Sequence, residues 1–555
     1  MSDAVAALPR RRRTPGWASA ALPVALLIAA PVASVLLVAL APSGSDTGHI
    51  LRTELPDLLA NTAMLALLVG LLAGSMGAIS AWLVSACDFR GRAVLEVALL
   101  LPLAMPAYVA GYAYVWLLDV AGPAQSLIRD VTGLRYGQYW FPPIRSLPGA
   151  ALMLASVLFP YVYLLCRTAF LTQSVCLLEA SRTLGHGLGR TFIHVALPMA
   201  RPALAAGIAL VLMETLADFG TVQHFAVRTF TTGIYDAWFG MGNRPAAAQL
   251  SAALIGLVAL LLLAERASRG GRRYHPTTTR QPPLRPVALR GWKQAAAILA
   301  CTLPVALGFL VPAGTLAFLM LEAFTWEEAA RTLPYAQHSL VLAAITAALA
   351  VALAALLAWA QRLHPAPLRA IANRVAGLGY ALPGSVIAVG ALVPFAAFDN
   401  ALDAWLRASF GVSSGLLLSG TIAALIFAYL VRFLAVALQA VESGLTRIRP
   451  SLSAAARVLG CTQGQAVRAV EFPLARGALL TAALLVFVDT MKELPATLIV
   501  RPFDFDTLAV RVHNLASDER LAEAATAALL IVAVGLVPVL LLLRSLRGGR
   551  EGNIT

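Results

Sequence analysis

The chain has 555 residues, of which 59% are hydrophobic and only 13% are charged. Ordinary soluble domains carry about 25% charged residues, so the composition excludes a soluble globular protein and indicates a membrane protein. The net charge of +14 could suggest a nucleic-acid partner, but the distribution of the basic residues favours a membrane topology instead, and we expect no nucleic acid.

Apolar runs long enough to cross a bilayer, which takes about 20 residues, recur along the whole chain. The first run follows the basic cluster Arg10–Arg13, as in a signal peptide. It is long for a signal peptide and has no clear cleavage signature, so we expect a retained first helix. We predict about twelve spans, at residues 17–41, 59–86, 94–118, 149–170, 202–220, 247–264, 296–321, 337–360, 375–397, 415–436, 474–498 and 524–543.

The basic residues lie mainly on one side of the predicted membrane. If the N-terminus is inside, 30 of the 42 Lys and Arg residues fall in the even-numbered loops and the termini, whereas 11 fall on the opposite side and Lys492 lies within a span. By the positive-inside rule, the sequence predicts that both termini are cytoplasmic.

Cysteines and histidines give no sign of a metal site. The five cysteines are scattered and form no CxxC pair, so the pattern favours buried apolar residues over disulfides or a metal cluster. They are Cys87, Cys166, Cys176, Cys301 and Cys461. The histidines are also scattered, and we expect no metal ligands within the membrane.

The chain contains an internal repeat. Residues 179–204 align with residues 454–479 at an offset of 275, and 11 of these 26 positions are identical. Further matches, such as Pro106 with Pro383 at an offset of 277, extend the repeat over two halves. We therefore predict an all-α polytopic protein of about 12 transmembrane helices in two parallel six-helix repeats, at residues 1–264 and 296–555. Residues 265–295, rich in Arg, Pro and Thr, are predicted to form a flexible cytosolic linker.

The best preserved part of the repeat is a polar loop between the fourth and fifth spans of each half. Good helix formers are followed by glycines, and an interior glycine costs a helix about 1 kcal/mol relative to alanine. The pattern predicts a short helix, a glycine turn and a second short helix at the cytosolic surface. One such loop could be an amphipathic connector that lies on lipid, but two copies at the same place favour a docking element. The shared positions include Gly185/Gly460, Gly189/Gly464 and Pro198/Pro473.

Glu179-Ala180-Ser181, followed by Gly185 and Leu197-Pro198, resembles the EAA loop of ABC importer permeases. The resemblance implies that each loop inserts into a groove on a cytosolic ATPase subunit and transmits ATP-driven motion to the membrane helices. The second copy has Ala454 in place of the family's glutamate, so docking of that half would lose one polar contact. The resemblance assigns ATPase coupling to Glu179, Ala180, Gly185, Pro198, Ala454, Gly460 and Pro473.

Within the importers, the chain most resembles the fused two-repeat permeases of ferric iron uptake, on residues 214–222, 491–498 and 501–508. The resemblance implies a multi-pass protein of the bacterial inner membrane that translocates ferric iron. It also implies a homodimeric ATPase, which uses the ATP, and a periplasmic or extracellular substrate-binding protein, with no cofactor bound by this chain. Fused thiamine permeases share the layout, so thiamine or another small solute is the alternative substrate.

Charged residues fall within the predicted fifth span of each half. Glu214 and Asp218 are four residues apart, which would place them on one helix face, and Asp489 and Glu493 are their counterparts at an offset of 275. Ionisable groups at this depth normally face a cavity or a partner. These residues, with Lys492, are candidates for a pathway or gate that suits a cation. The alternative is that they bond to backbone, serine, threonine or each other between helices.

Prolines interrupt the predicted third helix of each half, at Pro102, Pro106 and Pro383. Interrupted membrane helices can mark substrate sites, but they can equally be kinks whose free backbone groups bond to neighbouring helices. The sequence leaves both interpretations open.

The chain has no Gly-x-x-x-x-Gly-Lys-Ser/Thr loop for binding phosphates, and only two lysines. ATP hydrolysis would therefore come from a separate subunit, and we predict a non-catalytic membrane subunit. A secondary transporter driven by an ion gradient is the alternative from a different class, but it would not need paired docking loops. A membrane-embedded enzyme is disfavoured by the lack of a catalytic cluster.

Overall fold

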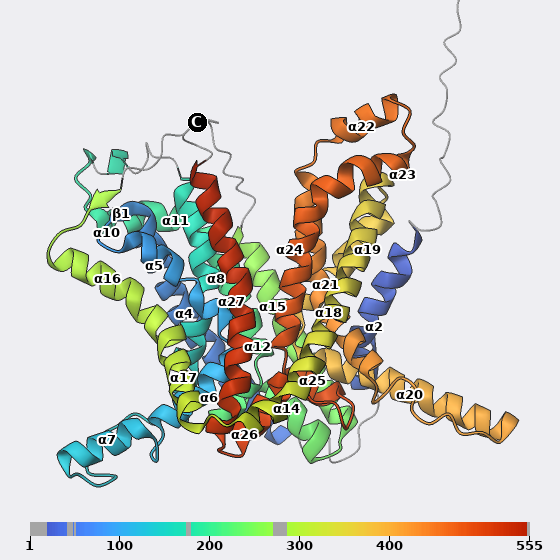
Figure 1. Ribbon diagram of the computed structural model, residues 1–555, viewed down its shortest axis with the longest axis horizontal. Coiled ribbons are helices and arrows are strands. Elements are labelled where there is room, and N and C mark those ends of the chain that lie inside the picture. Colours follow the sequence, from blue (N-terminus) through green and yellow to red (C-terminus); the bar gives the residue numbers. More distant parts are fainter. Residues whose placement is uncertain are drawn as a thin grey trace, which may run out of the picture. The chain divides into compact units, whose positions relative to one another are not determined.

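The computed structural model describes residues 19–40, 48, 52–173, 179–181, 183–269 and 286–551, with side chains as far as residue 541. The described chain is almost entirely helical (Figure 1), and its only strands are the two-residue β1 (Cys87–Asp88) and β2 (Val287–Ala288). Among the described residues, 10 helices are long and apolar enough to cross a membrane, or up to 12 if each of two bent pairs is one span. The predicted all-α polytopic class is confirmed.

The helices follow the predicted spans in order, with short helices between them. In the predicted first half they are α2 (Ala21–Ala39), α4 (Leu55–Ala86), α5 (Arg92–Ala98), η1 (Leu101–Ala104), α6 (Ala107–Leu118), α7 (Pro123–Thr132), α8 (Leu147–Leu171), α10 (Leu188–Thr191), η2 (Phe192–Ala196), α11 (Leu197–Met199), α12 (Arg201–Ala217), α13 (Gly220–His224), α14 (Phe230–Tyr235), η3 (Asp236–Gly240) and α15 (Arg244–Arg269).

In the predicted second half the helices are α16 (Trp292–Val305), η4 (Ala306–Leu310), α17 (Val311–Ala323), α18 (Trp326–Leu363), α19 (Pro367–Ala376), η5 (Gly379–Ala381), α20 (Gly384–Phe410), α21 (Ile422–Thr446), α22 (Pro450–Val458), α23 (Gln463–Ala466), η6 (Val467–Glu471), α24 (Phe472–Met491), α25 (Pro495–Val500), α26 (Leu508–Ser517) and α27 (Leu521–Glu551).

The chain packs as two compact units. The larger unit is formed by Pro31–Ala343, Ala381–Ala428 and Val488–Thr555. The smaller unit is formed by Met1–Ala30, Ala344–Tyr380 and Tyr429–Phe487. The first repeated loop belongs to the larger unit and the second to the smaller one.

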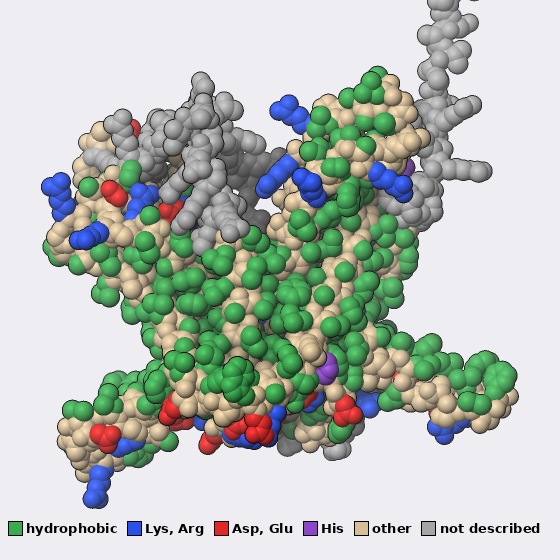
Figure 2. Space-filling view, in the orientation of Figure 1, with side chains coloured by type: hydrophobic (Ala, Val, Ile, Leu, Met, Phe, Trp, Pro, Cys, Tyr) green, Lys and Arg blue, Asp and Glu red, His purple; other side chains and the backbone are tan. Residues whose placement is uncertain are grey.

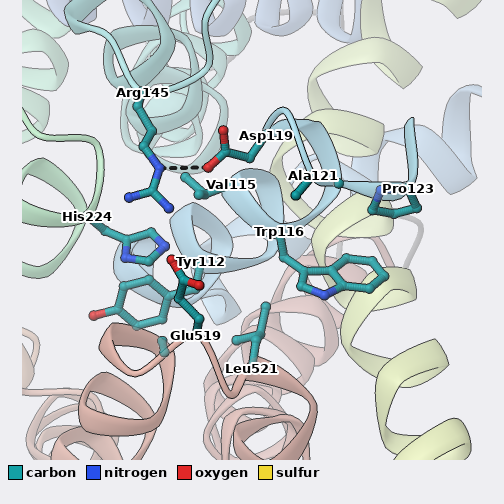
Figure 3. Close-up of a pocket in the computed structure, with 12 residues that line it drawn as sticks. Tyr112, Val115, Trp116, Asp119, Ala121, Pro123, Arg145, His224, Glu519 and Leu521 are labelled. Atoms are coloured by element: carbon teal, nitrogen blue, oxygen red, sulfur yellow. Dashed lines mark hydrogen bonds and ion pairs between the residues drawn. The ribbon is translucent and has the colours of Figure 1, made fainter. Parts of the chain in front are cut away.

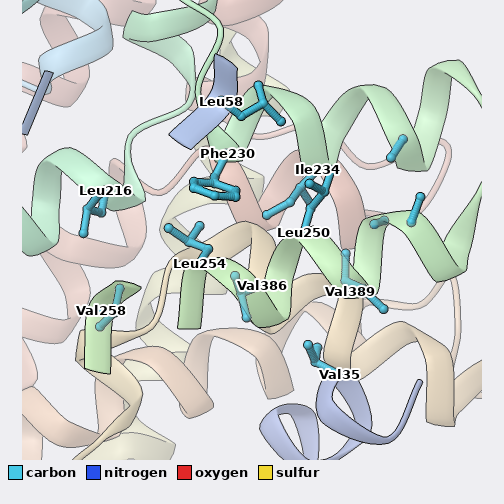
Figure 4. Close-up of a cluster of buried hydrophobic side chains, with 14 residues drawn as sticks. Val35, Leu58, Leu216, Phe230, Ile234, Leu250, Leu254, Val258, Val386 and Val389 are labelled. Carbon is cyan, nitrogen blue, oxygen red and sulfur yellow. The ribbon is translucent and has the colours of Figure 1, made fainter. Parts of the chain in front are cut away.

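Large apolar side chains cover the sides of the membrane-spanning helices, as Figure 2 shows for one face. Leu26, Leu71 and Leu299 are each more than 55% exposed, as expected of residues that face lipid. Lipid tails are as apolar as leucine, so these helices gain little from hydrophobic burial against one another, and close packing of small residues matters more. In the cluster of Figure 4, Ala246–Ala248 accordingly lie buried beside Phe230 and Val389.

The first helix of the predicted second half packs against the first half. Tyr114 Oη on α6 donates a hydrogen bond to the carbonyl of Leu307 in η4 at 2.6 Å. A Cβ atom on Gly308 would collide with the carbonyl oxygen of Ser156 on α8. Glycine is therefore the residue that lets these two helices approach so closely.

The prolines break the third span of the first half, as predicted. Residues Arg92–Ala104 and Ala107–Thr132 are bent by 93° at Pro106, which is extended at φ −63° and ψ 136°. In the second half, α19 ends at Ala376 and α20 begins only after Pro383. The predicted spans 94–118 and 375–397 are therefore each broken at a proline, with a short 3-10 helix, η1 or η5, just before the break.

The prediction that Glu214 and Asp218 share a helix face is wrong. Helix α12 ends at Ala217, and Asp218 is extended at φ −69° and ψ 138°. Helix α24 likewise ends at Met491, before Glu493.

The linker is not a flexible tether over its whole length. Helix α15 continues to Arg269, and β2 pairs in parallel with β1, with Leu289 N–H donating to the Asp88 carbonyl at 2.8 Å. Both ends of the predicted linker are thus structured, whereas residues 270–285 lie outside the described part.

Candidate functional site

The second repeated loop has the predicted order of a short helix, a turn and another short helix. Helix α22 is followed by a turn at Gly460 and by α23, which continues through η6 into α24 (orange in Figure 1). The η6 segment is a single π-helical turn. Such turns are rare and occur frequently at functional sites.

The first repeated loop has the same order. Residues 179–181 and 183 are helical, a turn follows, and α10 leads into the π-helical turn η2. With an offset of 275, η2 at 192–196 corresponds residue for residue to η6 at 467–471. Residues 174–178 and Arg182 lie outside the described part.

Glycine ends the first helix of each loop. Gly185 and Gly460 have φ angles of +83° and +96°, which are left-handed values that residues with a Cβ avoid. The next residue closes the turn in both copies, with the His186 and Cys461 N–H groups donating to carbonyls five residues earlier, each at 3.1 Å. This is the Schellman end of a helix. The predicted glycine turn is therefore confirmed at this pair of positions.

The second pair of repeated glycines has no such role. Gly189 and Gly464 lie inside α10 and α23, without a positive φ angle and with open space where a Cβ would be. The sequence pattern alone could not separate these two pairs, because all four glycines are equally well matched in the repeat.

The two prolines differ in their surroundings. Pro473 lies inside the continuous helix Gln463–Met491, two residues after the π-helical turn η6 ends. Pro198 lies in α11, and the chain bends by 77° between Leu188–Met199 and Arg201–Ala217. A second proline, Pro202, begins α12 where the other copy has Gly477. This additional proline removes another backbone donor and accounts for the bend.

Exposed side chains on both loops are available to a partner. Glu179 and Ala180 are exposed, and Ala454 is partly buried on α22. Leu184 and Leu459, at equivalent positions in the two glycine turns, are 77% and 85% exposed. We did not predict a role for these leucines, although their identity in both copies was a usable signal. In Figure 2, Lys and Arg side chains gather around the segment of the second loop.

The acidic residues after the fifth span of each half cap the short helix that follows. Asp218 accepts hydrogen bonds from Thr221 Oγ1 at 2.8 Å and from the Val222 N–H at 3.1 Å. Glu493 accepts them from the Ala496 N–H at 3.0 Å and from Thr497, whose N–H and Oγ1 lie at 3.1 Å and 2.8 Å. Both carboxylates thus satisfy backbone donors at a helix start.

The other charged residues of this region form local contacts. Lys492 Nζ lies 2.9 Å from Asp489 Oδ1, within the larger unit. Glu214 lies on α12, one helical turn before Asp218. These bonds of Asp218, Glu493 and Lys492 are all to groups three or four residues away in the chain, so they are local contacts and not contacts between helices.

A cavity of about 390 Å³ lies beside α6 (Figure 3). We call it the Arg145 cavity. Arg145 Nε forms an ion pair with Asp119 Oδ2 at 2.8 Å, and Glu519 also lines the cavity, at a left-handed φ of +61°. Non-glycine residues with this conformation are uncommon and cluster at functional sites. The lining is Tyr112, Val115, Trp116, Asp119, Ala121, Gly122, Pro123, Arg145, His224, Ala516, Glu519 and Leu521.

One neutral histidine, His224, lines the Arg145 cavity, and a second, His513, contacts the lining residue Tyr112. Tyr112 Oη is 2.6 Å from His513 Nδ1, and the Tyr112 ring contacts the His224 ring edge-on with centroids 4.7 Å apart. Burial lowers the pKa of both His224 and His513 to about 4, and the cation of Arg145 lowers that of His224 further. Two carboxylates and one guanidinium therefore carry the charge of the cavity at neutral pH.

Among the described residues, no group of three or more His, Cys, Asp or Glu side chains could hold a metal ion. Three of the four described cysteines, Cys87, Cys166 and Cys301, are buried, and Cys461 is partly exposed.

Comparison with known proteins gives two matches to one family model. The family described as "Binding-protein-dependent transport system inner membrane component" matches residues 66–268 and again 350–547. Each match contains one repeated loop with its π-helical turn.

Several relatives support the same family. The Fe(3+)-transport system permease protein FbpB 2 of Haemophilus influenzae is 28% identical over 89% of this chain and 90% of its own length. The molybdenum transport system permease protein ModB of Escherichia coli is 31% identical over 34% of this chain and 81% of its own length. The sulfate transport system permease protein CysT of Escherichia coli is 26% identical over 40% of this chain and 78% of its own length.

The shorter relatives cover about one predicted repeat, whereas the iron-transport relative is similar along almost the whole chain. With its many apolar helices, its two family matches and its duplicated loops, the chain belongs to the family of inner-membrane components of binding-protein-dependent transport systems.

Proposed function

We propose that this chain is the membrane-spanning permease subunit of an importer for ferric iron, driven by a separate ATPase. The observation that carries the proposal is the end-to-end similarity to an Fe(3+)-transport permease, at 89% coverage of one chain and 90% of the other. The molybdenum and sulfate relatives match 34% and 40% of the chain.

The proposed mechanism is alternating access. A substrate-binding protein delivers the substrate to the outer face, and closure of the ATPase, which we expect to be a homodimer, moves both repeated loops. The contact residues proposed for the ATPase are Glu179, Ala180, Gly185 and Pro198 in the first loop and Ala454, Gly460 and Pro473 in the second. The exposed Leu184 and Leu459 supply an apolar contact in each loop, as expected of a surface that binds a partner.

The substrate class can be tested by uptake in a strain that lacks its own iron importer. Cells with this chain, its ATPase and its binding protein should accumulate radioactive ferric iron, whereas molybdate, sulfate and thiamine should not compete. Uptake of one of those solutes without iron would overturn the iron assignment and leave the transport role intact. ATP-independent uptake by the purified chain would instead identify a secondary transporter.

A molybdate-type oxyanion is the second candidate, because the relatives with 31% identity are named for molybdenum. The Arg145 cavity argues against it. The only guanidinium in its lining is paired with Asp119, and Glu519 adds a second carboxylate, so an oxyanion would meet net negative charge.

The orientation is part of the proposal, with both termini and both loops in the cytoplasm of a bacterial cell. Cys461, next to the glycine turn, is a native probe because it is partly exposed. In a variant whose other four cysteines are serine, a membrane-permeant maleimide should label Cys461 in intact cells. An impermeant maleimide should label Cys461 only after lysis. Labelling of intact cells by this impermeant reagent would contradict the orientation.

The acidic residues of the pathway or gate hypothesis can be tested by neutral substitutions. Asp218→Asn and Glu493→Gln remove the charge and keep one of the two oxygens that accept the capping hydrogen bonds. If the charges serve cation passage, the double variant should fold normally and lose most uptake. Wild-type uptake in the double variant would leave these residues with a capping role alone. Asp489→Asn, Glu214→Gln and Lys492→Met complete the same series.

A further inference from the structure

A buried carboxylate lies at the end of the second repeated loop. Glu471 is the last residue of η6 and is only 2% exposed. Its Oε1 accepts a hydrogen bond from Ser453 Oγ at 2.6 Å, and its Oε2 accepts one from Trp359 Nε1 at 2.8 Å. Ser453 lies on α22 and Trp359 on α18, so one carboxylate joins the loop helix to a membrane-spanning helix.

Arg362 extends this contact to the beginning of the loop. Its Nε lies 3.5 Å from Glu471 Oε2. Its Nη1 and Nη2 donate hydrogen bonds to the carbonyls of Leu445 at 2.6 Å and Ile448 at 2.9 Å, where α21 ends. Both ends of the loop are therefore held on the same turn of α18.

These four residues, Trp359, Arg362, Ser453 and Glu471, form what we call the Glu471 cluster. All four belong to the smaller unit. A buried carboxylate is stable only when it is paired and hydrogen-bonded. Because its donors come from both α18 and α22, the carboxylate is satisfied only while the loop helix lies against α18.

The first loop lacks this cluster. Ala196 stands at the position equivalent to Glu471, at an offset of 275, and Ser85 at the position equivalent to Arg362, at an offset of 277. The Ser85 hydroxyl is buried without a hydrogen-bond partner. No charge can join the first loop to α4 at these two positions.

Neutral contacts hold the first loop instead. The Gln173 Nε2 at the end of α8 donates to the Ala196 carbonyl at 2.9 Å. Trp82, the counterpart of Trp359, packs against Phe192 with ring centroids 5.5 Å apart. A tryptophan thus contacts the π-helical turn in both halves, but only in the second half is it hydrogen-bonded to a carboxylate there.

We propose that Glu471 is a positioning residue that makes the second loop move together with α18, so that the two loops transmit motion to the membrane by different contacts. This inference rests on the proposed coupling function of the loops. The second loop thus has an acidic residue, Glu471, that contacts the membrane-spanning helix α18. It lacks the family's glutamate, because Ala454 stands at that position.

The first experiment measures hydrogen exchange of the α22 amides in the purified chain. Ser453→Ala removes the one hydrogen bond between α22 and the carboxylate and should speed this exchange roughly tenfold, since a hydrogen bond to a charged group is lost. Ser451→Ala, on the same helix with an exposed side chain, is the matched control and should exchange like the wild type. Trp359→Phe, which keeps an aromatic ring but removes the N–H donor, should shift exchange in the same direction as Ser453→Ala.

The second experiment measures substrate transported per ATP hydrolysed in the assembled transporter. Ser453→Ala and Glu471→Gln should lower this ratio several-fold while the ATPase still co-purifies and the melting temperature of Ser453→Ala stays near that of the wild type. A merely structural role would lower yield and stability without changing the ratio.

Unchanged α22 exchange and an unchanged transport ratio in Ser453→Ala would overturn the proposal. If the wild-type assembly shows no ATP-dependent transport, the proposed function fails instead, and the exchange experiment on the chain alone still decides whether the Glu471 cluster holds the loop. If Glu471→Gln fails to fold, Ser453→Ala and Trp359→Phe carry the test.

Discussion

One pair of equivalent positions is in contact in both halves, although the side chains that make the contact differ. Glu96 forms a buried ion pair with Arg167. At the equivalent positions, with offsets of 277 and 275, Asn373 Nδ2 donates to Glu442 Oε1 at 3.0 Å. The acidic residue of the pair is on the third helix in the first half and on the fourth helix in the second half. The contact between the two helices is present in both halves. A buried pair of this kind is costly to break from one side only.

The glycine turns give a sharp prediction at the same scale. The double variant Gly185→Val/Gly460→Val places a β-branched residue at a left-handed φ in both loops, which costs roughly 1–2 kcal/mol at each site. Binding of the ATPase in a pull-down should therefore weaken about tenfold or more.

The matched control for this prediction is Gly189→Ala/Gly464→Ala. These glycines are helical and have open space around the missing Cβ, and alanine is the better helix former by about 1 kcal/mol. The control should bind the ATPase at least as well as the wild type, and equal losses in both double variants would contradict a role for the turn itself.

Among the elements, the short helices α13 and α26 are notable for the neutral histidines that they bring to Tyr112. The folded-state pKa of His224 and of His513 is about 4 because both are buried, whereas an unfolded histidine titrates near 6.5. Between these two values the unfolded chain binds more protons than the folded one, so stability is full above pH 6.5 and falls as the pH is lowered toward 4.

The prediction is that the melting temperature of the purified chain decreases between pH 7 and pH 5, and that the decrease is smaller in His224→Gln. Thermal unfolding in detergent across this range would measure it. His194→Gln, a change at an exposed loop histidine, serves as the control and should follow the wild type. A His224→Gln profile parallel to the wild type would show that this histidine is not the cause.

On the scale of the whole molecule, the larger unit combines helices from both predicted halves. Helix α17 packs against α27 and also against α6, and the Pro31 carbonyl lies against Gly390 on α20. The first helix of each predicted half therefore contacts the other half, and the covalent linker is not what keeps them together.

A protease site inserted within residues 270–285 tests this packing. After cleavage, the two fragments should elute together in size-exclusion chromatography in mild detergent and separate only on denaturation. Gly308→Leu, which places a side chain against the Ser156 carbonyl, should weaken the association. Independent elution of the fragments from the cleaved wild type would show that the contacts of each first helix with the other half do not hold the halves together.

The sequence predicted the class, the order of the spans, the broken third helix and the glycine turns, because hydropathy, proline and glycine act locally. It did not predict where the fifth spans end. Asp218 and Glu493 looked like membrane charges on a helix face, and only the structure shows that they cap the next helix.

Contacts between distant segments were also beyond the sequence. Nothing near Glu471 in the chain indicates that its partners are Trp359, 112 residues earlier, and Ser453. The Arg145 cavity likewise joins four separate segments, and no local pattern marks Glu519 as a residue with a left-handed backbone. Such contacts depend on tertiary packing, which a single sequence without homologues does not report.

The close contact of Gly308 with α8 has a consequence for how the chain is made. Synthesis proceeds from the N-terminus, so α8 is inserted long before η4 leaves the ribosome. Until then, the face of α8 at Ser156 has no partner and stays open to lipid or to the insertion machinery. The first half therefore completes its packing only after about 150 more residues are translated, and a chain truncated within the linker should be an early substrate for membrane proteases.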